Sequence, residues 1–75
     1  MKNYKIAQGI TANNQDEQEA IGGYLALLEI MQGVDGVDPA DIAQIEEIVS
    51  DEKEHSHRLT EMALKYDGGI VEAED

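Results

Sequence analysis

The chain has 75 residues, enough for one small domain but short for a self-sufficient hydrophobic core, so we expect a metal ion or a partner subunit to contribute stability. Its 17 acidic residues against 5 basic ones give a net charge of −12, which disfavours nucleic acid and anionic membranes as partners. The absence of Cys excludes disulfides and thiolate metal sites. No apolar run reaches the roughly 20 residues of a membrane span, and no signal peptide is recognisable, so we expect a soluble, cytoplasmic protein.

Residues 1–13 show no sustained hydrophobic period. Ile6 and Ile10 could pack on a helix, but Gly9 and Thr11 lower the helix propensity between them. We therefore expect a flexible N-terminal arm that docks loosely or extends the first helix by one turn.

A first helix is predicted over residues 14–32. Asn14 and Asp16 are favourable N-cap types, and inward-facing positions then recur at spacings of three and four. These expected inner positions are Glu17, Ile21, Tyr24, Leu28 and Met31. Gly22 and Gly23 interrupt the helix propensity, and they suggest either a close approach of another helix or a local bend.

A second helix is predicted over residues 39–66, after a glycine-containing turn at residues 33–37. Asp38 is a good N-cap and Pro39 fits the first helical position, so the start of this helix is well marked. Its end is marked by the sequence Asp67-Gly68-Gly69, after which residues 70–75 form a short acidic tail.

The inner stripe of the second helix leaves two positions open, since either His55 or Ser56, and either Met62 or Ala63, could face inward. The other inner positions are Ile42, Ile45, Val49, Glu52, Leu59 and Tyr66. The fold class is therefore all-α: an antiparallel two-helix hairpin, forming a single domain over residues 1–75. One hairpin cannot bury both stripes, so we predict a homodimer, or a higher homo-oligomer, that builds a four-helix bundle.

Both inner stripes contain acidic side chains, and this is the chemical signal in the sequence. Glu17 lies in the first helix, and Glu52 lies in the second with His55 one turn later on the same face. Two copies would supply four carboxylates and two imidazoles, which balance the charge of two divalent cations. Ligands of this kind suit iron, with manganese or zinc as substitutes.

Two motifs resemble those of the ferritin-like superfamily, which includes bacterioferritin and rubrerythrin. The first runs from Glu17 to Tyr24, with Ala20 three residues after the Glu. The second is Asp51-Glu52-Lys53-Glu54-His55, which is similar to the Glu-x-x-His motif of the family, including the preceding Asp. A full-length member carries four helices in one chain, so this chain looks like a half-bundle member similar to encapsulated ferritins.

The resemblance implies a di-iron site between two subunits, with Glu17, Glu52 and His55 as metal ligands and Tyr24 bonded to a ligand carboxylate. It implies oxidation of iron(II) by oxygen or peroxide, a ferroxidase-type activity. An iron store or a shell protein would then be a partner, and the protein could be enclosed in a protein compartment.

Several alternatives remain open on the sequence. Glu19 is a rival ligand to Glu17, and His57 points about 200° away from His55 around the helix. Rubrerythrin-like peroxide reduction is a second activity, although the absence of Cys leaves no rubredoxin-type iron centre. The alternative from another class is a metal-free helical dimerisation or interaction module.

Overall fold

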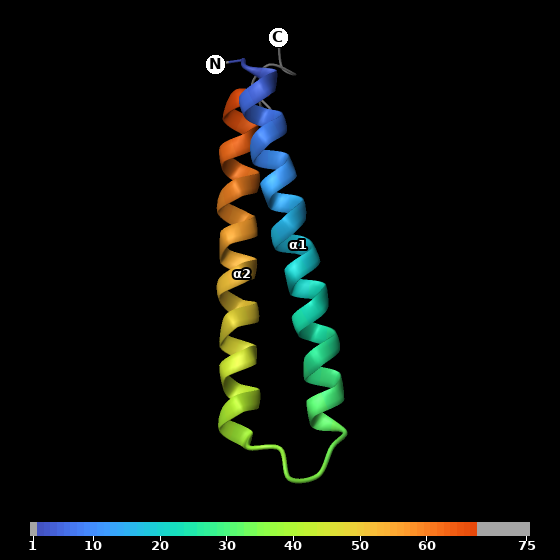
Figure 1. Cartoon of the computed structure of the whole chain (residues 1–75). Helices are drawn as coiled ribbons and strands as arrows, with labels where there is room; N and C mark the ends of the chain where they lie inside the picture. Colours follow the sequence, from blue (N-terminus) through green and yellow to red (C-terminus); the bar gives the residue numbers. More distant parts are fainter. Residues whose placement is uncertain (1, 68–75) are drawn as a thin grey trace.

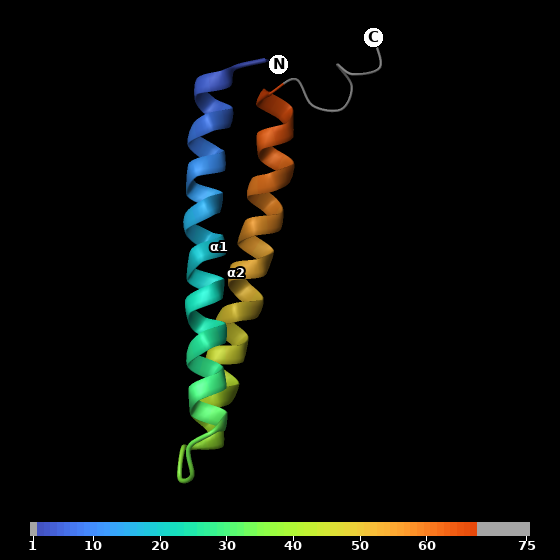
Figure 2. The ribbon, with the colours of Figure 1, turned by 90° about the vertical axis from the view of Figure 1, so that its right-hand side faces the viewer.

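The computed structural model describes residues 2–67, which form two long antiparallel helices joined by a short loop (Figure 1). α1 spans Tyr4–Gln32 and α2 spans Pro39–Tyr66. The two helices stay together along a rod of 57 × 17 × 14 Å (Figure 2). The predicted all-α hairpin is confirmed over these residues.

The helices meet along a regular seam, whose positions alternate at spacings of three and four residues. This heptad spacing is that of a coiled coil, in which each helix keeps one narrow face toward its neighbour. The spacing resolves both open choices, because Ser56 and Ala63 lie in the seam while His55 and Met62 are exposed beside it. The seam comprises the N-cap residue 3 and, on α1, residues 7, 10, 14, 17, 21, 24, 28 and 31; on α2 it comprises residues 42, 45, 49, 52, 56, 59, 63 and 66.

The apolar core occupies the half of the seam nearest the loop. Ile21, Leu28 and Val49 are buried there, and three half-buried side chains pack against them: Tyr24, Ile42 and Ile45. Toward the chain ends the seam alternates small and polar side chains with the half-buried Ile10, Leu59 and Tyr66, and Ala7 and Ser56 are buried there. The cluster of buried apolar side chains therefore lies at one end of the rod.

The start of α1 corrects the expectation of a flexible arm, because the helix begins at Tyr4 rather than near Asn14. Asn3 caps it: the Asn3 side chain accepts a hydrogen bond of 3.1 Å from the backbone N–H of Ile6. The Asn3 backbone N–H also donates to the carbonyl of Tyr66, which ties the start of α1 to the end of α2. This cap and the contact with α2 outweigh the low propensity at Gly9.

The loop and the start of α2 agree with the sequence prediction. Gly36 adopts a φ of 89°, a left-handed conformation that suits glycine in the turn. The Asp38 side chain then accepts a hydrogen bond of 2.9 Å from the Ala40 N–H, and Pro39 takes the first helical position. The predicted glycine stop and acidic tail lie outside the described residues.

The glycine pair in α1 does not serve a close helix contact within the hairpin. A Cβ placed on Gly22 or Gly23 would meet nothing within 4 Å, and both residues are exposed. Over residues 2–67, neither helix combines the length and apolarity needed to cross a membrane.

Candidate metal centre

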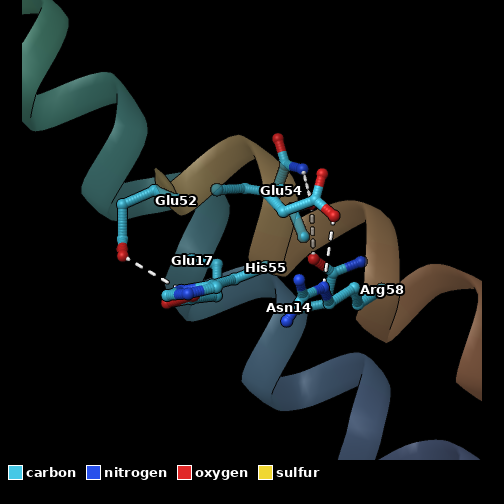
Figure 3. A network of polar contacts seen from close by, with 8 residues as sticks. Asn14, Glu17, Glu52, Glu54, His55 and Arg58 are labelled. Atoms are coloured by element: carbon cyan, nitrogen blue, oxygen red, sulfur yellow. Dashed lines mark hydrogen bonds and ion pairs between the residues drawn. The ribbon is translucent and has the colours of Figure 1, made fainter. Parts of the chain in front are cut away.

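The three predicted ligands converge near the middle of the rod. His55 Nδ1 lies 3.3 Å from Glu17 Oε2 on the opposite helix and 3.4 Å from Glu52 Oε1 one turn earlier on its own helix (Figure 3). One ligand atom from each of the three side chains lies within 4.8 Å of the others. The hairpin therefore brings together a carboxylate from α1 and a carboxylate–imidazole pair from α2.

The seam explains why these side chains meet and why their exposure differs. Glu17 and Glu52 both occupy seam positions, so they face each other between the helices and are only 24% and 19% exposed. His55 precedes the seam residue Ser56 and so lies on the flank, where its side chain is 52% exposed. The cluster is consequently open to solvent on the side from which His55 approaches.

The chemistry of this cluster suits a cation. Two carboxylates held close together repel each other, and a positive charge between them removes that repulsion. A set of carboxylate oxygens with one imidazole nitrogen is suitable for iron, manganese or zinc. Glu17, Glu52 and His55 could thus hold a metal ion.

The remaining candidate residues lie apart from the cluster. Tyr24 packs against the apolar core, and its hydroxyl forms no hydrogen bond to Glu17 or Glu52 in the described part of the chain. Glu19 is exposed and does not belong to the ligand group. His57 faces solvent and pairs with Glu61 at 3.4 Å, in agreement with its predicted position away from His55.

A polar layer beside the cluster was not anticipated from the sequence. The Ser56 hydroxyl is buried, donates a hydrogen bond of 2.7 Å to Asn14 Oδ1, and accepts one from Gln18 Nε2. Asn14 Nδ2 in turn donates to Thr60 Oγ1 at 2.9 Å. The available signal was that Asn14 and Ser56 continue the spacing of three and four that places Glu17 and Glu52 in the seam.

The outer side of α2 carries a separate ion pair. Arg58 Nε donates to Glu54 Oε1 over 3.1 Å, and both side chains are more than half exposed (Figure 3). A pair as exposed as this contributes little stability. The pair lies on the outer side of α2 and does not take part in the ligand cluster.

Comparison of the chain with protein-family models, with curated proteins and with solved structures finds no match. The residues of the cluster and the surface around it are therefore the basis for assigning a function. Those residues support a cation site formed by both helices of the hairpin.

Proposed function

We propose that the chain is one half of a di-iron protein of the ferritin-like type, whose metal site is completed by a second copy. In this proposal two hairpins associate into a four-helix bundle, and each copy supplies Glu17, Glu52 and His55. The protein then oxidises iron(II) with oxygen or peroxide. The observation that carries the proposal is the cluster of three ligands opening onto an exposed apolar surface.

We call that surface the ligand face. Along each helix, its positions are those that directly precede every second seam residue. On α2 the positions recur every seven residues as Ile48, His55 and Met62. On α1 the corresponding positions include Ile6 and Leu27. Because the helices are antiparallel, the positions directly before the seam lie on the same side of the hairpin in both helices. All five side chains are exposed in the single chain.

The opposite side of the hairpin is more polar, which favours the ligand face as the contact surface. The positions that follow the seam on that side carry Gln18 and Thr60, which belong to the polar layer, together with Glu46 and Lys53. Tyr4 and Leu25 are the exposed large apolar residues on that side. Burying the apolar side chains of the ligand face against a second copy would remove them from water and add to the thin core. A two-fold contact would also bring two ligand clusters together.

The charges of the residues match this arrangement. Two clusters hold four carboxylates, which balance two divalent cations and so lower the cost of burying either set of charges. Bound iron would supply one-electron redox chemistry toward oxygen or peroxide. The side chains of the ligand face would exclude bulk water from the centre. Oxidation of two iron(II) ions to iron(III) would release two electrons, which with two solvent protons would reduce oxygen to hydrogen peroxide, or hydrogen peroxide to two molecules of water.

The test is the metal content of the purified protein after anaerobic loading with iron(II), measured together with its mass by light scattering. We expect a dimer, or a larger even assembly, with two iron ions for each pair of chains. His55→Ala should lose the metal while retaining its helix content. His57→Ala, two residues away and outside the cluster, is the matched control and should bind like the wild type.

Other outcomes distinguish the alternatives. A dimer that binds no iron(II), manganese(II) or zinc would support the metal-free interaction module and overturn the metal assignment. A monomer that binds one ion would overturn the shared site. Oxygen or peroxide consumption by the iron-loaded protein separates a ferroxidase from a protein that only stores the metal, and His55→Ala should not show it.

A further inference from the structure

We infer that the polar layer formed by Asn14, Gln18, Ser56 and Thr60 is a positioning device for the metal ligands. It fixes the axial offset of α1 relative to α2 and thereby the distance between Glu17 and the Glu52–His55 pair. The inference rests on the proposed function for the identity of the ligands. The layer itself is a property of the hairpin.

The layer lies directly beside the candidate metal ligands in the seam. Asn14 lies one turn before Glu17 on α1, and Ser56 directly follows His55 on α2, so the layer occupies the seam step next to the ligands. Its hydrogen bonds cross between the helices from Gln18 to Ser56, from Ser56 to Asn14 and from Asn14 to Thr60. Any sliding of one helix along the other breaks these directional bonds before it disturbs the less directional apolar contacts.

The buried polar groups of the layer all have hydrogen-bond partners. Ser56 is 6% exposed, and no buried side-chain nitrogen or oxygen of the described residues lacks a hydrogen-bond partner. The Thr60 hydroxyl also donates to the Ser56 carbonyl at 2.9 Å, which fixes its orientation. A fully bonded polar group at a coiled-coil core position is a recognised means of setting register, at some cost in stability.

The ligands themselves do little to fix the alignment of the helices. In the metal-free protein His55 Nδ1 lies 3.3 Å from Glu17 and 3.4 Å from Glu52, and contacts between partly exposed side chains of this kind contribute little stability. The apolar core near the loop holds the helices together but lies on the other side of the ligands. The uncharged polar layer holds the helices together on the side nearer the chain ends. The ligands therefore lie between the apolar core and the polar layer.

The test replaces the layer with apolar side chains in the double variant Asn14→Leu/Ser56→Ala. Removing both partners of a buried hydrogen bond together is close to neutral for stability, so the variant should fold and keep its thermal stability. The chain contains no Cys, so spin labels can be placed at Thr11→Cys and Lys53→Cys, both exposed and outside the layer. Labelled chains are diluted with unlabelled chains so that distances within one hairpin are measured.

We expect a single narrow label distance in the metal-free parent protein and a shifted or broadened distribution in the double variant. Its affinity for manganese(II), followed by electron paramagnetic resonance of the free ion, should fall on the order of tenfold, as when outer partners of metal ligands are removed. A purely stabilising role for the layer would leave both readouts unchanged. Either readout remaining at its parent value overturns the inference.

Two further variants sharpen the result. Gln18→Ala removes one donor from an exposed position and should move both readouts in the same direction by a smaller amount; no movement in either overturns the inference. Ile45→Val, in the apolar core, is the control that should leave both unchanged. If the parent protein binds no metal, the proposed function fails, while the label distances in the metal-free protein still decide whether the layer fixes the helices.

Discussion

The two halves of the rod use the same seam for different purposes. In the half near the loop, the seam positions carry Ile21, Leu28 and Val49, and these are most of the buried side chains of the hairpin. In the half near the chain ends, the equivalent positions carry the candidate ligands Glu17 and Glu52 and the polar layer. One heptad pattern thus supports a stabilising region and a region of candidate metal ligands. The stability of the apolar half must offset the stability lost by placing polar and charged side chains in the seam of the other half.

The largest expected effect lies in the apolar half. Leu28→Ala should reduce the free energy of unfolding by about 3 kcal/mol, because it removes a buried side chain from a core that has few. The measurement is chemical denaturation at a fixed protein concentration, since association adds to stability. The fraction that remains folded should bind metal with unchanged affinity. A selective loss of affinity would mean that the two halves are not separable.

A metal ion should produce the next largest effect, and it should act on the polar half. At a free concentration one hundred times the dissociation constant, binding to the folded state alone adds about 2.7 kcal/mol of stability. Thermal denaturation with and without manganese(II) checks this expectation. The His55→Ala variant should show no metal-dependent rise, and removal of the ion with a chelator should return the parent protein to its metal-free stability.

The smallest predicted effect concerns the exposed glycine pair. Gly22→Ala should raise the free energy of unfolding by about 0.5–1 kcal/mol, because alanine favours the helix and its added Cβ meets nothing within 4 Å in the hairpin. Thermal denaturation measures the gain. If the substitution instead weakens association, another subunit approaches α1 at this point. The glycine pair would then serve a close helix contact between two hairpins rather than within one.

The sequence predicted α2 more accurately than α1, and the reason lies in how each helix begins. Asp38 and Pro39 mark the start of α2 by chemistry that is local to the chain. The first turns of α1 contain Gly9 and polar residues, and their helical state depends on the Asn3 cap and on contact with Tyr66 at the far end of α2. A contact over that separation leaves no local trace in the sequence.

The candidate site shows the same division. The pairing of Glu52 and His55 three residues apart predicted their contact, and the stripe position of Glu17 predicted that it would face them. The sequence did not decide whether His55 or Ser56 lies in the seam, because both residues fall close to the inward-facing direction of the helix. The partnership of Asn14 with Ser56 was also missed, since polar residues carry no hydrophobic signal even when they occupy core positions.

The slender outline of the hairpin has a consequence for its behaviour in solution. A rod 57 Å long and 17 × 14 Å across meets more friction than a sphere of the same 8.2 kDa mass, so a single chain should diffuse slowly for its size. Pairing along the ligand face would double the mass and leave the length almost unchanged, which makes the particle rounder. End-to-end pairing would instead lengthen it. Frictional ratio and maximum dimension in solution scattering therefore report which surface the protein uses.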